Sequence, residues 1–168
     1  MHAADNASRI GEGTLLSVKK IYENEINDLF IGAHLQAGGY IDIFEHGRII
    51  ISSLEKHSDG DQYIHWQRCK GKKVHPSSFG TAGANSPSRP VNGMGPAGAK
   101  VTAPDGQAVI FVEISYDYQP LISEKFTSIR TINAHSAFNV RDRRDLTQIY
   151  KHNSSDPVSN CSTYDRLT

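Results

Sequence analysis

The chain has 168 residues, 38% of them hydrophobic, and a mean hydropathy of −0.46. This length fits one compact domain with its own core. Because 18 Lys and Arg residues balance 18 Asp and Glu residues, the overall charge favours neither a nucleic-acid-binding nor a membrane-surface protein. The longest apolar runs, such as Ile49-Ile50-Ile51, are far too short to cross a bilayer.

Two helices are predicted near the N-terminus. Residues 1–10 place apolar side chains near one helical face, which predicts a short helical segment. From Thr14 to about Gln36 apolar residues recur at three- and four-residue steps, so a longer amphipathic helix is predicted there. The pair Gly38-Gly39 is a suitable C-cap. An alternative start near Asn24 makes the preceding residues a lead-in.

A β-hairpin is predicted next. Two β-rich runs, Gly47 to Leu54 and Gln62 to Cys69, flank the turn sequence Ser58-Asp59-Gly60-Asp61. The Asp-Gly pair supplies the positive φ that tight hairpins need. On the second strand, alternation predicts that Ile64 and Trp66 share one face, opposite Tyr63, His65 and Gln67.

Two more strands are predicted after a long connection. Residues 71–107 are rich in Gly, Pro, Ser, Ala and Asn, and we interpret them as a long surface loop. The run Val109 to Tyr118 alternates, with an apolar face formed by Ile110, Val112, Ile114, Tyr116 and Tyr118. A fourth strand is predicted over about Phe126 to Val140.

These elements predict a single α+β domain over residues 1–168. Its helical part is 1–37, its antiparallel sheet of about four strands is 47–141 with the loop 71–107, and 142–168 is a polar C-terminal tail. The apolar face of the sheet needs a cover, and the N-terminal helical part is expected to provide it.

Neither a cofactor nor a metal site is predicted. The segment Gly93-Met94-Gly95-Pro96-Ala97-Gly98 matches G-x-G-x-x-G, but it lies inside the Pro- and Gly-rich loop rather than between a strand and a helix. Of the 8 histidines, His57, His65 and His75 flank the hairpin. Their spacing, and the wide separation of the cysteines, match no metal-binding motif.

No catalytic residues are predicted either, so the chain is not expected to be an enzyme. The sequence has no Gly-x-Ser-x-Gly elbow. Glu113, Ser115 and Asp117 share the polar face of the third strand, where a carboxylate pair could perform acid–base chemistry. We interpret them instead as alternating solvated residues. The alternative hypothesis is a small hydrolase or metal protein that uses His and carboxylate side chains.

Two basic clusters could attract nucleic acid, yet no such partner is predicted. In Arg141–Arg144, acidic residues interrupt the run, which fits a surface of ion pairs. The cluster Arg68–Lys73 lies near Trp66, but that aromatic residue belongs to the predicted core face.

The chain has two cysteines, Cys69 and Cys161. If they pair, the bridge fastens the polar tail to the body of the domain and closes a loop of 92 residues, because 161 − 69 = 92. Two unrelated free thiols are the alternative that counting alone leaves open.

Several segments, in this order, resemble the TadE-like pilus assembly proteins. They are ADNASR (residues 4–9), INDLF (26–30), HWQRC (65–69), VEISYDYQPLI (112–122) and AFNVRDRRDL (137–146). Each motif is moderately specific, and their order strengthens the set. The similarity covers most of the chain except 71–107 and the last dozen residues.

This resemblance implies a pilin-like architecture, with an N-terminal helix laid on an antiparallel sheet. It also implies a minor pilin or assembly component of the adhesive tight-adherence pilus, placed in the periplasm or on the outside of the cell. The expected partners are other pilus subunits and the inner membrane, the latter through an N-terminal apolar helix that this sequence does not include. Either the chain continues upstream or it is a divergent soluble form.

In an exported protein of this kind a disulfide between Cys69 and Cys161 is expected. A free extracellular binding module is the second functional hypothesis, with loop 71–107 recognising a glycan or a protein.

Overall fold

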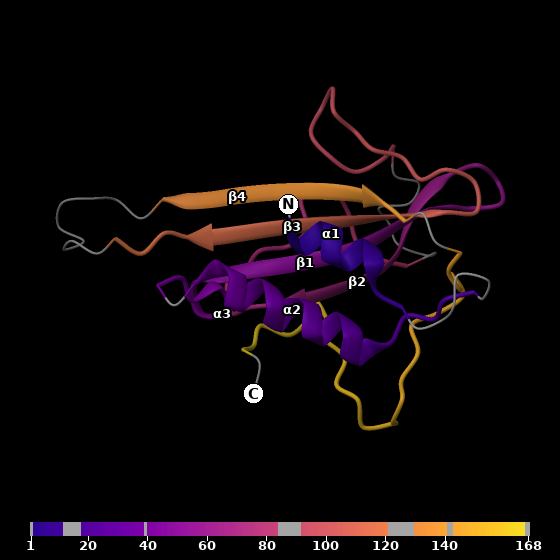
Figure 1. Ribbon diagram of the computed structural model, residues 1–168. Helices are drawn as coiled ribbons and strands as arrows, with labels where there is room; N and C mark the ends of the chain where they lie inside the picture. The colour runs from indigo at the N-terminus through magenta and orange to yellow at the C-terminus, as the bar shows by residue number, and fades with distance from the viewer. Residues whose placement is uncertain are drawn as a thin grey trace.

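The computed structural model describes residues 2–11, 18–38, 40–83, 92–120, 130–140 and 143–166. Within these ranges the elements, in chain order, are α1 (His2–Arg9), α2 (Glu23–Ala37), α3 (Ile43–His46), β1 (Gly47–Lys56), β2 (Gln62–Lys70), β3 (Ala108–Asp117) and β4 (Thr131–Asn139) (Figure 1). The predicted α+β class with an antiparallel four-stranded sheet is therefore confirmed.

The four strands form one sheet in the order β2-β1-β3-β4, and every neighbouring pair is antiparallel. The helices lie on one face of this sheet, with α1 over β3 and β4 (Figure 1). We call this side the helix face and the other side the loop face. The hairpin turn at Asp59-Gly60 is as predicted, and Gly60 has a φ of 97°.

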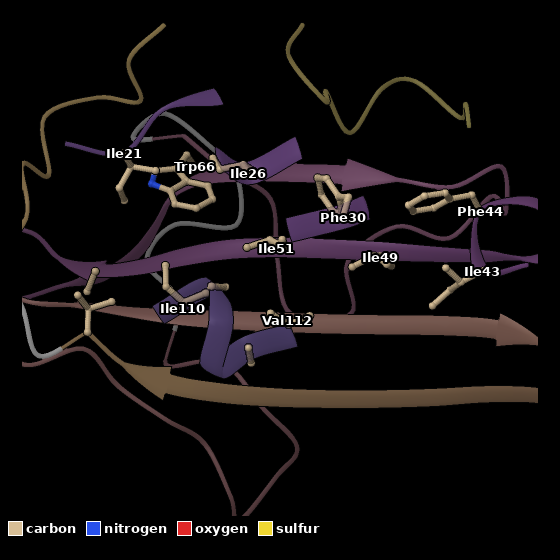
Figure 2. Close-up of a cluster of buried hydrophobic side chains, with 14 of the residues drawn as sticks. Ile21, Ile26, Phe30, Ile43, Phe44, Ile49, Ile51, Trp66, Ile110 and Val112 are labelled. Atoms are coloured by element: carbon tan, nitrogen blue, oxygen red, sulfur yellow. The ribbon is translucent and has the colours of Figure 1, made fainter. Parts of the chain in front are cut away.

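The helix face carries the larger core. Figure 2 shows its side chains from α2, α3 and the strands meeting in one layer. Ile26 and Phe30 of α2 are fully buried, and each such burial stabilises the fold by about 1.5–3 kcal/mol. From the sheet, alternate residues of β1 and β3 point into this layer, namely Ile49, Ile51, Ile110, Val112 and Tyr116. The apolar face predicted for β3 is confirmed for Ile110, Val112, Ile114 and Tyr116, whereas Tyr118 follows the end of the strand and is 48% exposed.

The second helix begins at Glu23, so the later of its two predicted starts is the observed one. Tyr22 is extended, and its backbone N–H donates to the Glu25 carboxylate at 2.8 Å, which satisfies an amide that the helix leaves unpaired. Residues 12–17 lie outside the described part. Residues 18–22 run beside the C-terminal segment, where Lys19 N–H donates to the Arg143 carbonyl at 2.9 Å.

The segment interpreted as a surface loop covers the loop face of the sheet, which corrects that prediction. Met94 is fully buried, and a second apolar cluster joins it to the strands. The members of this cluster are Leu54, Ile64, Met94, Ala103, Val109 and Phe111, with Phe79, Ala82, Val101 and Ala137 packed against them. The few apolar residues of 71–83 and 92–107 are thus enough to seal a second, smaller core.

The predicted pairing of Ile64 and Trp66 on one face is wrong. Ser53 pairs with Trp66 and Leu54 with Ile64, so His65 is an extra residue in β2. This β-bulge shifts the alternation of side chains between the two faces by one residue. As a result Trp66 packs in the helix-face core, whereas Ile64 packs in the loop-face core.

The last strand, β4, covers part of the predicted run Phe126 to Val140, of which residues 126–129 lie outside the described part. Its register with β3 is uninterrupted from Val109↔Asn139 to Asp117↔Thr131. Ile132, Ala134 and Phe138 lie on the helix face, because each is directly opposite a helix-face residue of β3.

Candidate interaction surfaces and buried polar clusters

The C-terminal segment is bound to the outer edge of β2. Cys69 and Cys161 form a disulfide with a Cα–Cα distance of 4.7 Å, which confirms the expected pairing. Around it, Cys69 N–H donates to the Ser159 carbonyl at 2.9 Å and Gly71 N–H donates to the Asp165 carbonyl at 3.0 Å. The segment therefore supplies backbone partners that a sheet edge otherwise lacks.

A buried arginine on β1 reinforces this attachment. Arg48 is 1% exposed, and its guanidinium donates to the carbonyls of Gly71 at 2.8 Å, Cys161 at 2.8 Å and Thr163 at 2.6 Å. Its side chain also stacks on the ring of Tyr164, 4.2 Å from the ring centre. Burial lowers the pKa of Arg48 from its ordinary value.

Glycine is required where β2 ends beside this arginine. Gly71 has a φ of 116°, and a Cβ atom there would lie 2.2 Å from the Gly47 carbonyl oxygen. No other residue fits this approach, and the sequence offered no sign of it. The link between Arg48 and the last residues was also missed, because it joins positions more than 110 residues apart.

A polar cluster lies at the bulge of β2. The Glu55 carboxylate, 4% exposed, accepts from the Ser53 hydroxyl at 2.8 Å and contacts His65 Nδ1 at 3.0 Å. This hydrogen bond raises the pKa of His65. A nucleophile requires the histidine between the hydroxyl and the carboxylate. Here the carboxylate lies between the other two, so the arrangement suits a structural role and not acyl transfer.

The carboxylate of β3 that was interpreted as solvated is buried. Glu113 is 4% exposed and accepts from the Ser77 hydroxyl at 2.6 Å and from the Ser78 N–H at 2.9 Å. Ser115 is 1% exposed. Asp117 pairs with Lys73, which lowers the Asp117 pKa together with a hydrogen bond from Thr131. The interpretation as alternating solvated residues is therefore wrong for Glu113 and Ser115, because the loop covers that face.

The loop leaves two adjoining hollows that share Ser78 and Phe79. One, of about 140 Å³, lies over β3 and β4 and is lined by Glu113, His75 and His135. The other, of about 410 Å³, is lined by Asn92, Lys100 and the glycine-rich segment 93–98. In that segment Met94 and Val101 pair across a tight turn, and no helix follows within 92–107. The geometry is thus that of a turn rather than of a phosphate loop.

Four exposed apolar residues lie in the second half of α2 and just after it. Ile31 and Leu35, one helical turn apart, are 40% and 73% exposed, and Tyr40 and Ile41 after the helix are 94% and 40% exposed. We call these four residues the α2-end surface. Scattered apolar residues need no explanation, but such a group within eleven residues of sequence marks a candidate contact with another protein.

The basic run after Trp66 is neutralised by carboxylates from four parts of the chain. Arg68 pairs with Glu23 of α2 and Lys73 with Asp117 of β3. Lys72 pairs with Glu45 of α3 at 2.8 Å, and Lys70 with Asp165 of the C-terminal segment at 3.2 Å. Arg141 and Asp142 of the second cluster lie outside the described residues. A cluster already occupied by acidic partners offers little positive potential to a phosphate backbone.

The three histidines named from the sequence are not brought together. His65 contacts Glu55, His57 contacts Asp59 at 2.9 Å, and His75 lines the smaller hollow. Within the described ranges, no group of three or more His, Cys, Asp or Glu side chains is arranged to hold a metal ion.

None of the helices in the described ranges combines the length and the apolar character that a membrane span requires. Neither a protein-family model, nor a curated protein, nor a solved structure matches this chain. Its function must therefore be argued from its own residues.

Proposed function

We propose that the chain is a non-catalytic, minor-pilin-like component of an adhesive bacterial pilus, or a factor in its assembly. In this proposal it acts in the periplasm or outside the cell, and an apolar helix upstream of α1 anchors its precursor in the inner membrane. Its partners are other pilus subunits. The ordered motifs in residues 4–9, 26–30, 65–69, 112–122 and 137–146 support this identity.

The observation that carries the proposal is the α2-end surface. The side chains of Leu35 and Tyr40 are 73% and 94% exposed, and contact of such apolar surface with water does not stabilise an isolated protein. A subunit that packs beside another buries such residues at the contact. The helices on one face of an antiparallel sheet and the bridged C-terminal segment also suit a rigid part of an extracellular assembly.

Gene deletion and complementation test this function. In the source bacterium, deletion is expected to reduce piliation in electron micrographs and adhesion to surfaces, and the wild-type gene is expected to restore both. The double variant Leu35→Asp, Tyr40→Asp is expected to be exported and folded but not to restore pili. Gln36→Asp, an exposed polar neighbour on the same helix, is the matched control and should complement fully. Normal pili in the deletion strain would contradict the proposal.

A free extracellular binding module is the second candidate, and the two hollows beside Phe79 favour it. Together they offer a carboxylate, two histidines, Asn92 and Lys100 next to an aromatic ring, a lining that suits a glycan. Binding of a glycan library to the purified chain tests this candidate. Ligands should be lost in the variant Asn92→Ala, Lys100→Ala and retained in Lys72→Ala, which changes a lysine that pairs with Glu45 of α3 and lines neither hollow.

A further inference from the structure

The outer edge of β4 is open. Two backbone hydrogen bonds fix which of its groups face outward: Tyr118 N–H donates to the Arg130 carbonyl and Val140 N–H donates to the Ala108 carbonyl. Because hydrogen-bonded pairs alternate in an antiparallel ladder, even-numbered residues of β4 bond to β3. The outward N–H and C=O groups therefore belong to Thr131, Asn133, His135, Ala137 and Asn139. Across the described ranges, none of these groups has a backbone partner on that side.

This strand carries none of the devices that keep sheet edges apart. Its sequence TINAHSAFN contains no Lys, Arg, Asp, Glu, Pro or Gly over nine residues. Its ladder with β3 has no bulge. Residues 131–135 are all exposed, and Ile132 is 52% exposed. A long, regular and uncharged edge of this kind is a template for another strand.

We propose that β4 pairs antiparallel with β4 of a second copy of this chain, about a two-fold axis at His135. This register sets each outward-facing residue opposite another one: Thr131 opposite Asn139, Asn133 opposite Ala137, and His135 opposite His135. Five hydrogen-bonded pairs result, with two bonds each. The two sheets become one continuous sheet with both helix faces on the same side.

The side chains also fit this register. On the helix face Ile132 lies opposite Phe138 of the second copy, so an exposed aliphatic side chain gains an aromatic cross-strand neighbour on each side of the axis. Next to the axis that face carries the small residues Ala134 and Ser136, and the residues of α1 beside them are also small, namely Ala3 and Ala4. No Lys, Arg, Asp or Glu of β4 meets another across this register.

A second copy is favoured over a growing chain of copies because the other edge is closed. The outer side of β2 bonds to the C-terminal segment and, at the Ile64 carbonyl, to Gly83 of the loop. Of the two sheet edges in the described structure, only β4 is therefore free. Pairing through one edge is isologous and stops at two copies. This inference does not depend on the proposed pilus function.

Two variants test the pairing on the intact, oxidised chain. Asn133→Pro removes an outward N–H that β3 does not use, and a proline is tolerated at such an edge position. In sedimentation velocity the wild-type chain is expected to be a dimer, and this variant is expected to dissociate at least about tenfold more readily.

His135→Cys should form an intermolecular disulfide across the axis, since residues opposite each other lie about 5.5 Å apart, within reach of a disulfide. The matched control is Thr131→Cys. Its counterpart in the second copy would lie eight residues along the strand, about 27 Å away, and should not be linked.

Sedimentation is repeated at about 100 times the protein concentration of the cross-linking experiment. A wild-type chain that is still monomeric there would overturn the proposal, even if the edge of β4 binds a strand of another protein. Equal cross-linking of His135→Cys and Thr131→Cys would overturn it as well. A dimer that survives Asn133→Pro would place the contact on another surface and would have the same consequence.

Discussion

The two edge strands of the sheet differ in whether another part of the chain bonds to their outer side. At β2 the chain uses a disulfide, the buried Arg48 and backbone hydrogen bonds from the C-terminal segment to occupy the outer side of the strand. At β4 the described structure shows an exposed, uncharged ladder with no such cover. The edge at β2 is thus protected twice. Its own sequence supplies a bulge and charged residues that discourage pairing, and a distant part of the chain covers its outer side.

The largest expected effect comes from releasing the cover of β2. The double variant Cys69→Ser, Cys161→Ser removes a bridge across 92 residues, which the chain-entropy model values at about 4–5 kcal/mol of unfolding free energy. Urea unfolding with and without reductant measures it. With both edges then open, species larger than a dimer are expected in sedimentation. A change below about 1 kcal/mol would contradict this expectation.

Removing the buried arginine should have the next largest effect. Arg48→Met keeps most of the side-chain volume but leaves three carbonyl groups without their donor, so a loss of about 3 kcal/mol is expected. Arg166→Met is the matched control. That arginine is half exposed and pairs with Asp42 at the surface, so less than about 1 kcal/mol should be lost. Equal losses in the two variants would contradict this account of β2.

The bulge of β2 should make the stability of the protein depend on pH. Since the hydrogen bond to Glu55 raises the pKa of His65 in the folded state, its contribution is fully present below the unfolded-state pKa and is lost as pH rises through the folded-state value. His65→Gln should therefore cost about 1 kcal/mol at pH 6 and progressively less above pH 7. Urea midpoints between pH 5.5 and 9 measure this. A His65→Gln variant that follows the same pH dependence as the wild type would contradict this expectation.

The smallest effect on stability is expected at β4 itself. Asn133→Lys adds a charge to an exposed position, so the unfolding free energy of the monomer should change by less than about 0.5 kcal/mol. A lysine on an edge strand also opposes pairing with another strand, so the dimer should dissociate more readily than the wild-type dimer. Chemical denaturation at low concentration and sedimentation at high concentration separate the two effects. A large loss of monomer stability would mean that this edge is already bonded within the chain.

The sequence predicts the elements whose patterns are local. The alternation around Val112 identified β3 and its helix face, and the Asp59-Gly60 pair located the hairpin turn. Two cysteines could be recognised as a pair only by assuming export. The α+β class follows from the order of these elements.

Contacts between distant segments are what the sequence did not reveal. Nothing in the alternation of β2 shows the extra residue at His65, because a bulge depends on how β1 meets the strand. Glu113 was interpreted as solvated since its cover comes from Ser77 and Ser78, more than thirty residues earlier. The role of Arg48 required knowing where the last residues lie.

That arginine also sets the order in which the chain can finish folding. Arg48 lies in β1 next to the centre of the sheet, yet two of its three acceptors are carbonyls of Cys161 and Thr163. Those acceptors are synthesised more than 110 residues after Arg48, so during synthesis or translocation the guanidinium lacks two of its three partners until they emerge. We expect a chain ending at residue 155 to remain sensitive to pulse proteolysis, and a chain that extends to residue 166 to be resistant.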